Sequence, residues 1–182
     1  MSPEHEARLK LLRERAERLA ARDEQALPRV LFARVVLVEV SRERYGIPVA
    51  SLRTIARATP ITPLPGLPAF AQGIAAVRGE LVSVIDLAEL RAIGRTGNST
   101  LFALLEAGTR SVAICIDAVL GFRDVFEDEL APDLSGDDRA RGLMRAVTRD
   151  LVSILAVERL LEGDQLIIGK RSREALPSEE GT

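Results

Sequence analysis

Few residues in this sequence have side chains that could do chemistry, and they are widely spaced. The one histidine, His5, cannot by itself supply a histidine-containing metal cluster or a Ser-His-Asp triad. Asp86, Asp117 and Asp150 each end or interrupt an apolar stretch, and two of them together could act as acid and base in a glycosidase-like reaction. Aspartate at such places more commonly forms a turn or a cap.

Motifs for cofactor chemistry are also missing from the sequence. There is no G-x-G-x-x-G run, no Walker A motif and no C-x-x-C spacing. We therefore predict that the protein is not an enzyme, that it carries no metal or other cofactor, and that its function depends on surfaces that bind partners.

The composition of the chain narrows the class of protein further. Its 182 residues, 47% of them hydrophobic, fit one domain with a sizeable core, and the net charge of −2 argues against phosphate-neutralising nucleic-acid binding. Cys115 is the only cysteine, so no internal disulfide forms, which favours a reducing compartment. The start of the sequence lacks the apolar region of a signal peptide, and no apolar stretch approaches the roughly 20 residues of a spanning helix. We expect a soluble cytoplasmic protein that does not insert into membranes.

A helical extension is predicted at the N-terminus, over residues 3–24 within a segment 1–28. Its apolar residues recur at helical spacings of three, four and three, and they are Leu9, Leu12, Ala16 and Leu19. Six acidic and six basic residues make the segment neutral, and Pro28 closes it. This helix could tether the protein, contact a second partner or shield a surface patch.

From residue 30 onward the pattern changes to short strands joined by turns. Strands are expected at 30–40, 45–49, 73–77, 81–86, 100–106, 111–116, 122–126, 143–147 and 151–155. Residues 50–58 fit either two helical turns or another strand. About ten strands suit two small barrels better than one large one, so we predict a mainly β domain over residues 29–162 with two packed lobes, followed by a tail 163–182 whose end is disordered.

Two connecting segments stand out. The stretch 59–68 holds four prolines, so we expect an extended connector that bridges the two lobes and opens the second with a hairpin turning at Arg78-Gly79. The stretch 124–138 holds seven acids and no base, and we expect a solvated acidic loop there rather than a calcium site.

Three side chains near the connector are candidates for a binding surface. Leu52 and Ile55, three residues apart, could face one apolar surface or belong to the core. Arg78, in a tight turn, is either a solvated charge or a functional residue.

At these residues the chain resembles the CheW family, the adaptor proteins of bacterial chemosensory arrays. The resemblance lies in Tyr45-Gly46-Ile47-Pro48, the run 61–65, Val77-Arg78-Gly79, and Val84-Ile85-Asp86-Leu87 in matching order and spacing. Residues 112–119 and 149–161 resemble the family's later strand and its closing hairpin and helix.

The resemblance implies two packed five-stranded SH3-like β-barrel lobes and a non-catalytic adaptor. Its partners would be the regulatory domain of a CheA-type histidine kinase and the cytoplasmic tip of a methyl-accepting chemoreceptor, which would associate it with receptor arrays. It also implies that Arg78 and Gly79 contribute to coupling, and that Leu52 and Ile55 contribute to the kinase contact. Two alternatives stay open: a CheW-like regulatory module that competes for array sites without coupling, and a β-barrel small-ligand binder or enzyme using Asp86, Asp117 or Asp150.

Overall fold

The computed structural model of the chain describes residues 29–96, 99–132 and 142–162. The predicted N-terminal helix and the tail 163–182 lie outside these residues. The described part contains ten strands: β1 (Leu31–Val40), β2 (Glu43–Pro48), β3 (Leu52–Arg57), β4 (Ala71–Val77), β5 (Glu80–Ile85), β6 (Leu101–Ala107), β7 (Arg110–Ile116), β8 (Ala118–Phe126), β9 (Met144–Val147) and β10 (Val152–Leu155). Its helical pieces are short: the 3-10 turns η1 (Val49–Ser51) and η2 (Glu127–Glu129), and the helices α2 (Leu87–Leu90) and α4 (Val157–Glu162). None of the described helices is long and apolar enough to cross a membrane.

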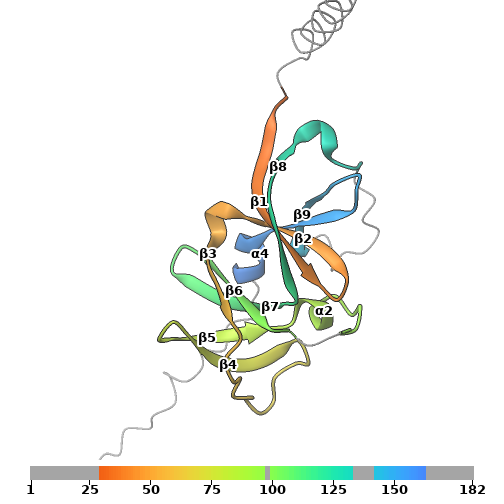
Figure 1. The fold of residues 1–182 in the computed structure, drawn as a ribbon. Coiled ribbons are helices and arrows are strands. Elements are labelled where there is room, and N and C mark those ends of the chain that lie inside the picture. Colours follow the sequence, from red (N-terminus) through yellow and green to blue (C-terminus); the bar gives the residue numbers. More distant parts are fainter. Residues whose placement is uncertain (1–28, 97–98, 133–141, 163–182) are drawn as a thin grey trace, which may run out of the picture.

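The strands form two five-stranded sheets, one in each lobe (Figure 1). The first lobe has the order β8-β1-β2-β10-β9, and the second has the order β3-β6-β7-β5-β4. Most neighbours are antiparallel, but β10 pairs with β2, and β5 with β7, in parallel. The predicted fold class, mainly β with two packed five-stranded lobes, is confirmed.

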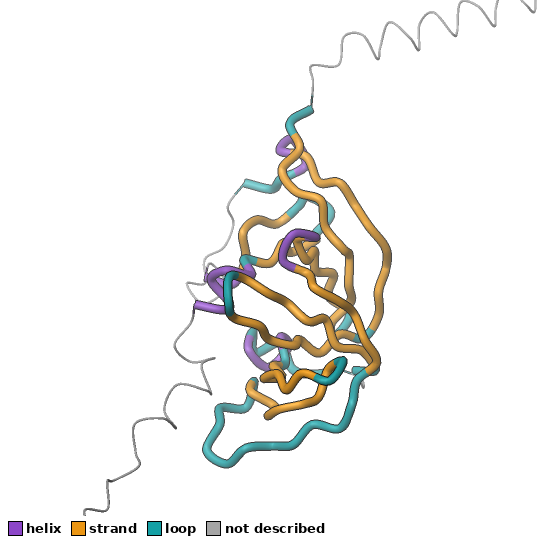
Figure 2. The backbone as a smooth tube through the Cα atoms, turned by 90° about the vertical axis from the view of Figure 1, so that its left-hand side faces the viewer, coloured by secondary structure: helices purple, strands orange, loops and turns teal. Residues whose placement is uncertain are grey.

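The predicted route of the chain between the lobes is wrong. Residues 50–58 form η1 and then strand β3, which already belongs to the second sheet. The proline connector therefore stays within the second lobe and joins its two edge strands, β3 and β4; it is the long loop at the lower end of Figure 2. The chain crosses between lobes at η1 and again at Asp117, between β7 and β8. The first lobe is thus assembled from both ends of the domain, which the local pattern could not reveal because β2 and β10 pair across more than 100 residues.

The core explains why several strands are apolar without alternation. On β6, Phe102 and Leu104 belong to a cluster inside the second lobe, whereas Ala103 and Leu105 belong to the large cluster between the lobes. Strands buried on both faces read as continuous apolar runs. The central cluster also receives Leu160 and its neighbours in α4, so one shared layer of apolar side chains holds the two sheets together.

Gly73 fixes the proline connector to β4. A Cβ atom at this position would lie 2.1 Å from the carbonyl oxygen of Thr62, and Gly73 has φ +131. The close approach accompanies two backbone hydrogen bonds, of 2.8 and 3.0 Å, that pair Thr62 with Ile74. The connector is thereby held against the strand that leads into the Arg78-Gly79 turn.

We predict that Gly73→Ala lowers the free energy of unfolding by about 3 kcal/mol, because the backbone of Thr62 must move and φ is unfavourable for alanine. Gly66→Ala is the matched control, since Gly66 also has positive φ (+77) but nothing lies within 4 Å of its added Cβ. Urea denaturation of both variants measures the difference. Equal losses in the two variants would show that the contact with Thr62 carries no weight.

Candidate functional site

Arg78 and Gly79 form the two-residue turn between β4 and β5. Both have positive φ, +52 and +85, and Val77 pairs with Glu80 on either side. This geometry is that of a type I′ turn, whose first position usually holds Asn, Asp or Gly. Arg78 is exposed, and its guanidinium makes no hydrogen bond or ion pair with any described residue. A cation with no described partner is therefore displayed at the tip of a tight hairpin.

Leu52 and Ile55 share one face of β3 because the strand contains a bulge. Leu52 pairs with Leu105, and Ile55 pairs with Ala103. Leu52 and Ile55 are three positions apart on β3, whereas their partners on β6 are only two positions apart. The extra residue restores the alternation, so both side chains point to the same side. That side packs against the cluster between the lobes, and both side chains remain half-buried.

Arg53 brings β3 and the hairpin together at one end of the second lobe. Its Nη1 donates to Oε2 of Glu80 at 2.7 Å, and its Nε lies 3.6 Å from Oε2 of Glu106 on β6. Glu80 follows Gly79 in the chain, and Leu52 precedes Arg53. The ion pair therefore places the Arg78-Gly79 turn and Leu52 at the same end of the second lobe, with Ile55 further along β3. Sequence reasoning missed Arg53, whose partners are 27 and 53 residues away.

An exposed apolar residue lies beside the same turn. Leu81 is 73% exposed and pairs across the hairpin with exposed Ala76. The Arg78 turn therefore presents a cation next to an apolar spot, a combination suited to a protein partner.

A pocket of about 500 Å³ lies where the two lobes meet. One wall is formed by α2 and neighbouring residues of the second lobe. The other is formed by the residues just before β9 and by α4. Its lining residues are Phe70, Glu89, Leu90, Ala92, Gly142, Leu143 and Arg159. None of the three candidate catalytic aspartates is among them.

Asp86 and Asp117 instead belong to an ion cluster centred on Arg95. Asp86 is only 2% exposed, accepts a hydrogen bond from Ala88 N–H that caps α2, and forms an ion pair with Arg95. Asp117 lies 3.3 Å from Arg95 Nη2 and accepts a 2.7 Å hydrogen bond from the backbone N–H of Ser41 in the other lobe. These partners leave both carboxylates in structural roles. No local pattern in the sequence pointed to Arg95, whose partners Asp86 and Asp117 are 9 and 22 residues away.

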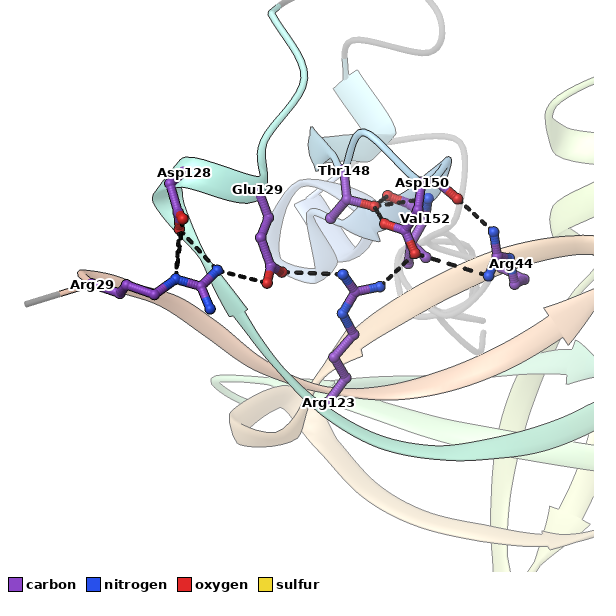
Figure 3. A network of polar contacts seen from close by, with 8 residues as sticks. All are labelled: Arg29, Arg44, Arg123, Asp128, Glu129, Thr148, Asp150 and Val152. Carbon is purple, nitrogen blue, oxygen red and sulfur yellow. Dashed lines mark hydrogen bonds and ion pairs between the residues drawn. The ribbon is translucent and has the colours of Figure 1, made fainter. Parts of the chain in front are cut away.

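Asp150 lies apart from these two, in an ion network on the first lobe (Figure 3). Its carboxylate accepts hydrogen bonds from Arg123 Nη1 at 2.7 Å and from the Thr148 hydroxyl at 2.6 Å. Arg123 and Thr148, in that order, hold the pKa of Asp150 at about 2. The network continues through Glu129 to Arg29.

The prediction of a solvated acidic loop at 124–138 is wrong for its first half. Asp124 lies in β8 and pairs with Arg34, while Asp128 and Glu129 pair with Arg29. The arginines come from the chain before and within β1, about 100 residues away, so a local count of charges missed them. Glu127, in η2, remains exposed as expected, and the other three acids of the stretch lie outside the described residues.

Two other kinds of site, a reactive cysteine and a metal centre, are not supported by the described part of the chain. Burial raises the pKa of the Cys115 thiol to about 11, which disfavours its reactive thiolate at neutral pH. No group of three or more His, Cys, Asp or Glu side chains among the described residues could hold a metal ion.

Comparison with known proteins accounts for this architecture. The model of the CheW-like domain family matches residues 34–165, most of the chain. The chain belongs to the CheW-like family. It is 32% identical over 126 residues to protein FrzA of Myxococcus xanthus, an alignment covering 65% of this chain and 79% of FrzA.

Two further relatives agree. A probable chemotaxis protein CheW of Rhizobium etli is 24% identical over 133 residues, covering 69% of this chain and 85% of that protein. The crystal structure of the scaffolding protein TtCheW from Thermoanaerobacter tengcongensis matches with a TM-score of 0.63 at 22% identity, covering 73% of this chain and 94% of that one. The fold is therefore that of a CheW scaffold, and the resemblance seen in the sequence is confirmed.

We predict that Arg95→Ala lowers the free energy of unfolding by about 3 kcal/mol, because it leaves the buried charge of Asp86 without its ionic partner. Arg34→Ala is the control, since the pair that Arg34 forms with Asp124 is largely exposed and its loss should have a much smaller effect. Thermal and urea denaturation would measure both. Similar values for the two variants would contradict a special role for Arg95.

A second prediction concerns acid stability. The pKa of Asp150 is lowered to about 2 in the folded protein from an ordinary 3.8, so its stabilising contribution is complete above about pH 4 and disappears as pH falls through 2. Asp150→Asn should therefore lower the free energy of unfolding by about 1 kcal/mol at pH 7, a value discounted for solvent exposure. The difference between variant and wild type should vanish near pH 2 in urea titrations. A difference that stays constant from pH 7 to 2 would contradict this assignment.

Proposed function

We propose that the protein is a non-catalytic adaptor that couples chemoreceptor cytoplasmic tips to a CheA-type histidine kinase in a chemosensory array. Membership of the CheW-like family supports an adaptor or scaffold in general. The observation that carries the finer proposal is the exposed, unpaired Arg78 at the tip of the β4–β5 hairpin. The Arg53–Glu80 ion pair joins this hairpin to β3, the strand that contains Leu52 and Ile55.

The kinase contact is assigned to this end of the second lobe. Partner binding at protein surfaces favours an exposed apolar spot and an arginine that can form charge-assisted hydrogen bonds. Leu81 and Arg78 supply these features, and the Arg53–Glu80 ion pair at 2.7 Å keeps β3 and the hairpin in a fixed relation. Leu52 and Ile55 contribute the part of their surface that the core leaves uncovered. Gly79 permits the turn itself.

The receptor contact is assigned to the pocket between the lobes. Its apolar lining includes Phe70, Leu90 and Leu143, and a groove of this kind suits the apolar face of an amphipathic helix. A helical receptor tip that sits here would touch both lobes. A signal would then pass to the kinase as a change in the relative geometry of the bound partners.

Reconstitution is the test of the proposal. Receptor fragments, kinase and this protein are combined, and kinase autophosphorylation is measured with binding to each partner alone. An adaptor binds both partners at micromolar concentration and makes kinase activity depend on the receptor. A protein that displaces another adaptor without restoring control is the competing regulatory module instead, and one that binds neither partner refutes both assignments.

We predict that Arg78→Glu weakens partner binding at least about tenfold, the effect expected when a charge pair at an interface becomes a repulsion. Arg42→Glu is a closely matched control, because Arg42 is also exposed and also lies at positive φ (+67) in a two-residue hairpin turn, but in the first lobe. Calorimetric titration with the kinase regulatory domain and the receptor fragment measures both variants. Equal effects of the two substitutions would remove Arg78 from the site.

A further inference from the structure

The first lobe carries an exposed apolar patch that neither assigned contact uses. It lies on β8 and consists of Val119, Leu120 and Phe122, which are 43%, 48% and 77% exposed. We call these three residues the β8 patch. β8 is an edge strand whose only described strand partner is β1.

The register of β8 against β1 places the patch beside the apolar cluster between the lobes. Phe122 pairs with Val36 and Val119 with Val38, and both valines are buried in the cluster between the lobes. Directly paired residues lie on the same face of a sheet, so Phe122 and Val119 extend that apolar layer to the surface. Leu120 is the extra residue of a bulge, because Gly121 pairs with Leu37.

We propose that the N-terminal segment 1–28 of this chain folds back and covers the β8 patch. The segment begins its path beside β8, since Arg29 is held there. Its guanidinium lies 4.1 Å from the ring centroid of Phe126, at the end of β8, and donates to Asp128 and Glu129 at 2.8–3.1 Å. The segment is therefore joined to the described domain beside the strand that carries the patch.

The length of the segment is sufficient to reach the patch. Between Leu19 and Arg29 the predicted helix, which ends at residue 24, spans about 8 Å, and the five residues after it span up to about 17 Å when extended, so the reach is about 24 Å. The path to be covered is shorter. Leu31 pairs with Phe126 and Val36 pairs with Phe122, and Leu31 and Val36 are about 17 Å apart along β1.

The chemistry of the segment also fits the patch. Its apolar stripe from Leu9 to Leu19 would be about 15 Å long in a helix, and the patch from Val119 to Phe122 extends over about 10 Å. The segment is neutral, with six acids and six bases, and the paired Arg34 and Asp124 next to the patch leave no net charge to repel it. This docking would be independent of any adaptor function, because it involves this chain alone.

Limited trypsin digestion of the full chain tests this docking, because the segment contains six basic residues at which trypsin cuts. Cleavage within residues 1–28 is followed by mass spectrometry in wild type, Phe122→Ser, Leu81→Ser and Leu151→Ser. Leu81 and Leu151 are matched controls, 73% and 76% exposed but outside β8. We expect Phe122→Ser to accelerate cleavage about tenfold, and the two controls to leave the rate unchanged.

Two results of the digestion would overturn the proposal. One is an equal cleavage rate in all four proteins, and the other is protection that rises with protein concentration, which would place a second copy on the patch. An independent readout uses the full chain with Leu12→Ser and Leu19→Ser together. Docking requires that the amide NMR signals of residues 118–122 shift in this variant, and unchanged signals there would refute it.

Discussion

The ion cluster around Arg95 is the interaction on which the arrangement of the two lobes depends. Asp86 is almost fully buried at the end of β5, so its charge is tolerable only because Arg95 and the start of α2 satisfy it. Through Asp117 the same arginine reaches the point where the chain returns to the first lobe, and Asp117 in turn binds the β1–β2 turn at Ser41. One guanidinium thus links both lobes with the crossing between them.

A second contact between the lobes reinforces the first. Arg91, which follows α2 in the second lobe, donates to Glu43 and to the Tyr45 hydroxyl in the first, each at 2.7 Å. Burial, followed by the hydrogen bond to Glu43, raises the pKa of the Tyr45 phenol, so it remains a neutral member of this contact. With the shared apolar core, these contacts make the lobes a rigid pair. Such an arrangement suits the proposed adaptor, which would transmit a signal through the relative geometry of its bound partners.

The candidate binding surface at the Arg78 turn and β3 could be predicted from the local sequence only in part. The turn at Arg78-Gly79 follows from its residues, since glycine between two apolar stretches favours a tight hairpin. That Leu52 and Ile55 share a face was expected only as a possibility, and it is true because of a bulge at Arg53 that no local pattern specifies. Their half-buried packing against the core, and the ion pair from Arg53 to Glu80, depend on strands that meet only in the folded protein.

The sequence by itself determined the class of this protein, a mainly β chain of short strands in two lobes. It also showed that side chains able to do chemistry are few and widely spaced, and that the run from Tyr45 to Leu87 resembles CheW adaptors. These features are local, because strand periodicity, prolines and turn residues act within a few positions. Only the tertiary structure decided which strands share a lobe and that the proline connector stays inside the second one. It also decided that Asp124, Asp128 and Glu129 are paired with arginines. Parallel strand pairing and ion pairs join residues tens of positions apart, and their partners are fixed by three-dimensional packing rather than by neighbours in the chain.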